Sequence, residues 1–263
     1  MSTPEYLEPS EPPPPIDDVA EYKNAWLYVG AVLLTLTLVK PLGGIAVVGT
    51  IAFTFAAILQ LYLPLHRSAK LGRDYDWVGL HLRAWRKDVK IVLILCAITF
   101  PPFIIGHHLY MENLHGWVEG LGLGDLARFI PERRFAPETS GSLAEWATRG
   151  WWLLSITATH SLGVALPEET FYRGYLQPQF ERRWKPIRKI FGVPMGRAAI
   201  FAAALFALGH FLGEWNPLRL GPFFPALVFA WQRNASGSVV GAITYHAACN
   251  ILGEVLFSLY KPV

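Results

Sequence analysis

The chain has 263 residues, of which 52% are hydrophobic, 14% aromatic and only 16% charged. With a mean hydropathy of +0.31, this composition argues against an ordinary soluble domain and favours a membrane protein. The net charge of +3 does not indicate nucleic-acid binding, because the basic residues collect in two loops between apolar segments.

The first 21 residues are acidic and rich in proline, without the basic region or cleavage site of a secretory signal peptide. This composition predicts a disordered, solvated tail over residues 1–21. The two cysteines, Cys96 and Cys249, lie inside apolar segments and indicate neither a disulfide framework nor a metal-binding pair.

Apolar segments that could cross about 30 Å of hydrocarbon recur along the chain. In order, they cover residues 25–39, 43–65, 89–106, 151–166, 198–212, 218–231 and 238–260. Segment 89–106 contains the kinking pair Pro101 and Pro102, and segment 218–231 is short and interrupted by proline. The pattern predicts an all-α, polytopic membrane bundle with about seven to eight transmembrane helices.

The distribution of positive charge predicts an orientation. One basic loop contains Arg67, Lys70, Arg73, Arg83, Arg86, Lys87 and Lys90, and the other contains Arg182, Arg183, Lys185, Arg188, Lys189 and Arg197. The positive-inside rule places both loops, and therefore the N-terminus, in the cytoplasm. Residues 107–142 then lie outside. We expect an integral protein of a bacterial cytoplasmic membrane.

Charged and polar side chains inside a bilayer need a reason, because a charge at a helix centre costs about 2.5–3.5 kcal/mol. Three motifs contain such groups: Glu168, Glu169 and Arg173 in LPEETFYRG, His210 in FALGH, and His246 and Asn250 in HAACN. Phe206 precedes His210 by four residues. A spacing of four residues puts two side chains of each motif on one helical face. With a rise of about 1.5 Å per residue, all three motifs reach a similar depth, about 14–20 Å from the nearest loop boundary.

These groups suit hydrolysis by an activated water. A carboxylate in a sheltered cavity is a stronger base, and a neighbouring histidine can orient the water or carry its proton. A second histidine and an amide can donate hydrogen bonds to an oxyanion. Each pair alone is commonly structural, as a salt bridge, an interior histidine or a packing contact. Their coincidence at one depth favours a function. All of them lie in residues 143–263, which we expect to form the catalytic membrane domain, with residues 22–142 as accessory helices and an external loop.

The ordered trio Glu-Glu-x-x-x-Arg, Phe-x-x-x-His and His-x-x-x-Asn resembles the CAAX-protease and bacteriocin-processing (CPBP) family of intramembrane proteases. The resemblance covers roughly residues 143–260. It implies that Glu168 is a general base that works with His210 on a catalytic water. It also implies that His246 and Asn250 bind the oxyanion. Glu169 and Arg173 would support the site.

The resemblance implies an endopeptidase that cuts near the C-terminus or membrane anchor of a membrane-associated protein. One branch of the family trims residues after a lipidated cysteine, another processes C-terminal anchors of exported proteins, and the sequence does not choose between them. A non-enzymatic membrane protein, for transport or immunity, that uses the same polar groups for binding is the alternative.

No cofactor is expected. The alternative is a zinc ion held by Glu169, His210 and His246 with a fourth position for water. The helical HExxH pattern of many zinc proteases is absent, and no GxSxG indicates a serine nucleophile.

Overall fold

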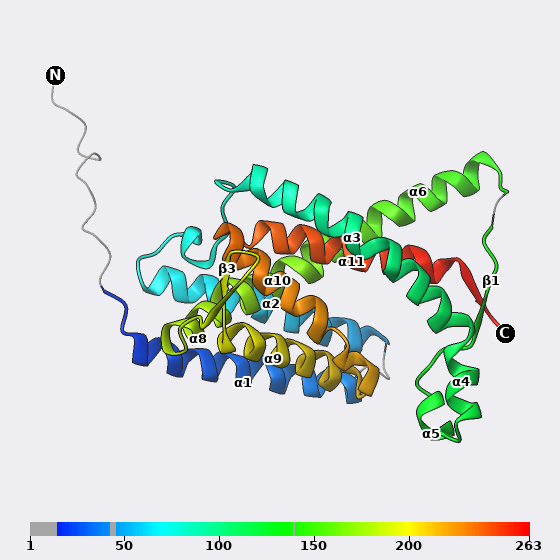
Figure 1. Cartoon of the computed structure of the whole chain (residues 1–263), viewed down its shortest axis with the longest axis horizontal. Helices are drawn as coiled ribbons and strands as arrows, with labels where there is room; N and C mark the ends of the chain where they lie inside the picture. The colour runs from blue at the N-terminus through cyan, green and yellow to red at the C-terminus, as the bar shows by residue number, and fades with distance from the viewer. Residues whose placement is uncertain (1–14, 43–45, 139) are drawn as a thin grey trace.

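The computed structural model describes residues 15–42, 46–138 and 140–263, and it is an all-α bundle (Figure 1). The long helices are α1 (Asp18–Leu42), α2 (Ala46–Lys70), α3 (Trp85–Glu112), α9 (Arg197–Glu214), α10 (Phe223–Ser236) and α11 (Val240–Ser258). Between α3 and α9 lie the short helices α4 (Leu114–Gly120) and α5 (Gly124–Ala127), and then a continuous helical run. That run consists of α6 (Leu143–Ala158), η3 (Thr159–Ala165), α7 (Leu166–Glu169), η4 (Thr170–Leu176) and α8 (Gln177–Arg183).

Strands contribute only two small antiparallel pairs in the described residues. β1 (Arg133–Phe135) pairs with β4 (Tyr260–Pro262), which joins the segment before α6 to the C-terminal segment. β2 (Arg188–Ile190) and β3 (Val193–Met195) form a hairpin between α8 and α9. Two short turns, η2 (Tyr75–Val78) and η5 (Pro217–Leu220), complete the described connections.

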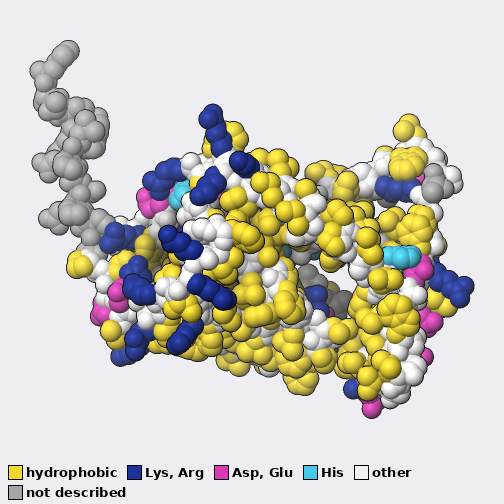
Figure 2. All heavy atoms as spheres, viewed as in Figure 1, with side chains coloured by type: hydrophobic (Ala, Val, Ile, Leu, Met, Phe, Trp, Pro, Cys, Tyr) yellow, Lys and Arg dark blue, Asp and Glu magenta, His cyan; other side chains and the backbone are white. Residues whose placement is uncertain are grey.

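Five helices in the described part of the chain, α1, α2, α3, α9 and α11, are long and apolar enough to cross a membrane. The helical run over residues 143–183 and the shorter α10 occupy the places of the other two predicted spans. The predicted count of seven to eight spans therefore stays a prediction. Large apolar side chains such as Leu27, Ile51 and Leu93 face outward, and Figure 2 shows an apolar surface over most of the bundle. Such a surface suits contact with lipid.

The last residues of the predicted tail, 18–21, belong to a helix. Residues 1–14 lie outside the described residues, but Asp18–Leu42 is helical, so residues 18–21 are not disordered. Asp17 accepts hydrogen bonds from the amides of Val19 and Ala20. Glu21 is buried and pairs with Arg67 of α2. The acidic composition concealed this helix start, because Asp and Glu also stabilise the first turn of a helix.

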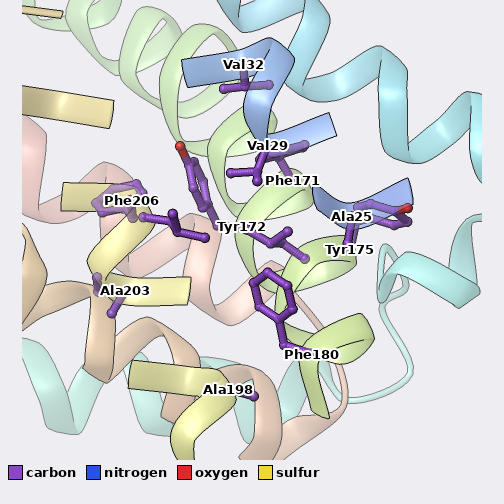
Figure 3. Close-up of a cluster of buried hydrophobic side chains, with 13 residues drawn as sticks. Ala25, Val29, Val32, Phe171, Tyr172, Tyr175, Phe180, Ala198, Ala203 and Phe206 are labelled. Atoms are coloured by element: carbon purple, nitrogen blue, oxygen red, sulfur yellow. The ribbon is translucent and has the colours of Figure 1, made fainter. Parts of the chain in front are cut away.

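A buried apolar cluster joins the first helix to the later ones (Figure 3). Ala25, Val29 and Val32 of α1, spaced by four and three residues, form one helical face that meets Phe171 and Tyr175 of η4. The cluster continues to α9 and α10 through Ala198, Ala203, Leu205, Phe206 and Ala226. The N-terminal helices and the helices of residues 143–263 thus share one core.

Both basic loops lie at the same end of the bundle. The amide of Val239, before α11, donates to the carbonyl of Gly79 in the first loop at 2.9 Å. At the end of α10, Asn234 donates to the carbonyl of Pro194 in the β2–β3 hairpin at 2.9 Å. Lys and Arg side chains gather around this end, where α1 also begins (Figures 1 and 2). The opposite end carries α4, α5 and the β1–β4 pair.

Candidate active site

The glutamate pair lies where the helical run changes its winding. Two π-helical turns, η3 and η4, flank the short segment α7 that carries Glu168 and Glu169. The amide of Leu166 donates to the carbonyl of Ser161, five residues earlier, as a π turn requires. Pro167 has no amide proton to offer a preceding carbonyl, which favours irregular winding here. Such π turns inside helices are frequent at functional sites.

Glu169 is completely buried and is held by two partners. Its Oε1 accepts a hydrogen bond from Nη1 of Arg173 at 2.8 Å, and Nδ1 of His246 lies 2.8 Å from the same oxygen. Arg173 is also completely buried, and its Nη2 donates to the carbonyl of Ala226 at 3.2 Å. The predicted Glu–Arg contact one turn apart is therefore present, and it links η4, α10 and α11.

Aromatic rings pack around this ion pair. The guanidinium of Arg173 lies 4.4 Å from the ring centre of Phe206 and 5.1 Å from that of Phe229. Phe229 stacks on the imidazole of His246 at 4.9 Å with nearly parallel planes. Phe206 also contacts His210, at 4.5 Å between ring centres. The rings shield the charges from lipid and limit how the imidazoles turn.

Both histidines are held through the same ring nitrogen. Nδ1 of His210 lies 3.0 Å from the carbonyl oxygen of Phe206. A carbonyl only accepts, so this hydrogen bond requires the proton on Nδ1 and leaves Nε2 as an acceptor in the neutral ring. In His246, Nδ1 faces Glu169, while Nε2 lies 3.8 Å from Oε2 of Glu168. In each ring, Nε2 therefore makes no hydrogen bond to a described residue and can contact a water or a substrate in the cavity.

A cavity of about 450 Å³ brings most of the predicted residues together. Its walls include Glu168, His210, His246 and Asn250, with Phe206 and Tyr172 beside them. Oε2 of Glu168 is buried and has no hydrogen-bond partner among the described residues. Glu169 and Arg173 are not among the described residues that line the cavity. The structure thus separates the two glutamates, since one faces the cavity and the other lies behind it.

The cavity extends from this group toward the end of the bundle away from the basic loops. Glu214 at the end of α9, Arg219 in η5 and Glu254 in α11 line that part. Arg219 pairs with Glu214 at 2.6 Å, and His160 lies 3.9 Å from Glu254. His160 had no predicted role. Its nearness to Glu254 could not be read from two positions so far apart in sequence.

Residues from the N-terminal helices also line the cavity, and the sequence analysis missed them. They are Leu36 of α1, Phe53 and Gln60 of α2, and Phe103 of α3. A signal for one of them was available, since Gln60 is a polar residue within the apolar stretch AILQLYL. Residues 22–142 therefore supply part of the wall of the site.

Glu169, His210 and His246, the alternative zinc ligands, use some of their donor atoms in other contacts. In the described part of the chain, no three His, Cys, Asp or Glu side chains are grouped as metal ligands. Oε1 of Glu169 is shared by Arg173 and His246, and Nδ1 of His246 is used in that contact. A zinc ion held by these three side chains would have to use Oε2 of Glu169 and Nε2 of both histidines, because the other donor atoms already make hydrogen bonds.

A family model described as Type II CAAX prenyl endopeptidase Rce1-like matches residues 150–252. This segment belongs to the CAAX protease (CPBP) family. The match contains all three motifs and confirms the resemblance. The family of this segment supports intramembrane endopeptidase activity in general, and together with the long apolar helices it supports an integral membrane protein. Comparison with curated proteins gives no match, and comparison with solved structures gives none either.

Proposed function

We propose that this CAAX protease-like protein is an endopeptidase that hydrolyses a peptide bond near the C-terminus or membrane anchor of a membrane-associated protein. The observation that carries the proposal is the unequal pairing of the two glutamates. Oε1 of Glu169 is hydrogen-bonded to Arg173 and His246 behind the cavity. Glu168 lines the cavity, and its buried Oε2 makes no hydrogen bond to a described residue, with Nε2 of His246 3.8 Å away. A carboxylate that faces a cavity and accepts no hydrogen bond from the protein can take a proton from a water bound there.

Glu168 takes the proton from the water that attacks the peptide carbonyl carbon. The carboxylic acid formed in this step then returns the proton to the amine as the C–N bond breaks. His210 lines the same cavity, and its Nε2 accepts the second hydrogen bond that orients the water. Its Nδ1 contact with the Phe206 carbonyl keeps the ring in the tautomer that this role requires.

The tetrahedral intermediate carries a negative charge on its oxygen. Side chains of α11, on the other side of the cavity, can stabilise this oxyanion with hydrogen bonds. The amide of Asn250 donates one hydrogen bond from the cavity wall. Nε2 of His246 donates another when the imidazole is protonated. All these steps use side chains of the chain alone, so the proposed mechanism needs no metal.

The direction of the cavity bears on the substrate. The positive-inside rule predicts that the basic end of the bundle is cytoplasmic, and the cavity extends toward the other end. Substrate would then enter from the extracytoplasmic side, where C-terminal anchors of exported proteins lie. This supports an anchor-processing enzyme in a bacterial cytoplasmic membrane over one that trims prenylated proteins from the cytoplasm.

Replacing Glu168 with Gln tests the proposal. Mass spectrometry of C-terminal peptides from cell-envelope proteins would compare cells with the wild-type chain, the Glu168→Gln variant and a Glu119→Gln control, whose carboxylate is largely exposed outside the bundle. We expect processed C-termini in the wild type and the control, and their loss in Glu168→Gln at an unchanged level of folded protein. Equal processing in all three would refute the proposed enzyme and leave a binding function as the better explanation.

A further inference from the structure

Helix α2 turns one narrow polar and small-residue face inward. Ala56, Gln60, Pro64 and Ser68, at intervals of four residues, are all buried, while Ile51, Phe53, Phe55 and Ile58 are largely exposed. Gln60 is the residue of this face that lines the cavity with Glu168 and His210. An amide in the middle of an apolar span is costly, so its place at the cavity needs an explanation.

The side chain of Gln60 is only 3% exposed, and no hydrogen bond joins it to any residue that the structure describes. Pro64, four residues later, has no amide proton for the carbonyl of Gln60. The oxygens of Gln177, Gln179 and Gln232 are also unpaired among the described residues, but these side chains are not in the described cavity wall. Gln60 therefore combines two properties: an unpaired buried amide and a place at the site.

A protease needs its substrate locally extended, and an extended peptide at membrane depth exposes amide and carbonyl groups that water does not reach. A glutamine amide offers one acceptor and two donors on one short planar group, which matches the amide and carbonyl groups of a peptide backbone. Lys70, at the basic end of α2, is ten residues beyond Gln60, which corresponds to about 15 Å along the helix. This is within the depth expected for the three motifs.

We propose that Gln60 is a positioning residue that hydrogen-bonds the main chain of the extended substrate, so that α2 forms one wall of the substrate-binding site. This inference rests on the proposed endopeptidase function. The partner is recognised by its peptide backbone, so the contact favours no particular side chain in the substrate. Gln60 touches no reacting atom, and its contribution is expected in substrate binding rather than in the chemical step.

The test begins with the protein whose processing depends on Glu168 in the envelope comparison, and a synthetic peptide across its cleavage site is the kinetic probe. Three full-length proteins are compared in the same membranes: wild type, Gln60→Met, which keeps the length but removes the amide, and Ile58→Met on the exposed face of α2. We expect KM to rise about tenfold or more in Gln60→Met, with kcat within about threefold of the wild type. The control should match the wild type.

Thermal unfolding separates positioning from a structural role. Since no described hydrogen bond is lost, Gln60→Met should unfold at the same temperature as the wild type or higher. An unchanged KM, a fall in kcat alone or a clear fall in unfolding temperature would each overturn the role of Gln60. If no processing depends on Glu168, the endopeptidase proposal fails and the Gln60 proposal fails with it. If processing depends on Glu168 but not on Gln60, only the latter is wrong.

Discussion

Nδ1 of His246 lies 2.8 Å from Oε1 of Glu169, the carboxylate oxygen that also accepts a hydrogen bond from Arg173. This contact joins α11 to α7 across 77 residues of sequence. Through this contact Glu169 orients the imidazole of His246, while Glu168 faces the cavity. The two adjacent carboxylates are thereby given different surroundings by one shared hydrogen-bond network.

Replacing Arg173 with Met should destabilise the protein by about 3–5 kcal/mol, because it leaves the buried charge of Glu169 without its cation. The measurement is the thermal unfolding midpoint in detergent micelles. Arg188→Met, at an exposed position in the β2–β3 hairpin, is the matched control and should change little. Equal losses in the two variants would show that the buried pair is not important for stability.

Replacing Asn250 with Ala should lower kcat by about 10²–10³-fold and leave KM nearly unchanged. The reason is that an oxyanion donor acts on charge that develops only in the transition state. Steady-state cleavage of the peptide identified with the Glu168→Gln comparison gives both constants. Thr244→Ala, an exposed position on the same helix, serves as the control. A rise in KM at constant kcat would instead make Asn250 a substrate-binding residue.

Replacing Gly174 with Ala should destabilise the packing of η4 against the η2 loop by about 1–3 kcal/mol. A Cβ at this glycine would lie 2.5 Å from the carbonyl oxygen of Val78, which is backbone and yields little. Gly30→Ala in α1 has no described atom within 4 Å of its new carbon and should be neutral or slightly stabilising. Unfolding midpoints that shift equally would contradict this packing constraint.

Acid should loosen the attachment of the C-terminal segment. The hydrogen bond from Lys261, the charge of Lys261 and the charge of Arg149 lower the pKa of Glu138 below its ordinary value of 4.5. Stability from this pairing is therefore complete above pH 4.5 and is lost as the pH falls through the lower folded-state pKa.

Hydrogen exchange at the amide of Ala136, which donates to the carbonyl of Leu259 at 2.9 Å, reports on this attachment. Protection, corrected for intrinsic exchange, should stay constant above pH 4.5 and fall as the pH is lowered below that value in the wild type. A Glu138→Gln variant should lack that dependence on pH, and the same dependence in both proteins would assign it to another group.

The parts of the site that follow local rules could be predicted from sequence. Spacings of four residues placed Glu169 with Arg173, and the rise of a helix placed His210 and His246 at one depth. The contact of His246 with Glu169 depends on how α11 packs against α7, which no local pattern encodes. The wall supplied by α2 was missed for a related reason, because no polar residue lies three or four positions from Gln60.

The helix boundaries show a similar limit. Apolar segments located the cores of the spans, but α1 begins at Asp18 and α3 at Trp85, beyond the predicted apolar edges. Charged residues at the ends of these helices keep the helical backbone conformation but lie outside the hydrocarbon layer. Hydropathy therefore locates the part of the helix inside the membrane and not the ends of the helix. The π turns around Glu168 were not predictable from the residue types alone.

Those π turns have a consequence for variation in this chain. Each one accommodates an extra residue within a turn, so a residue removed from Thr159–Ala165 would return this turn to regular α winding, whereas a residue removed from α6 would rotate the preceding part of that helix relative to α7 by about 100°. Either α6 or the carboxylate of Glu168 would then face a different neighbour, although all residues of the three motifs would be unchanged. The direction of the Glu168 side chain therefore depends on the number of residues before it as well as on their identity, and the loss of one residue from α6 would change which neighbours it meets.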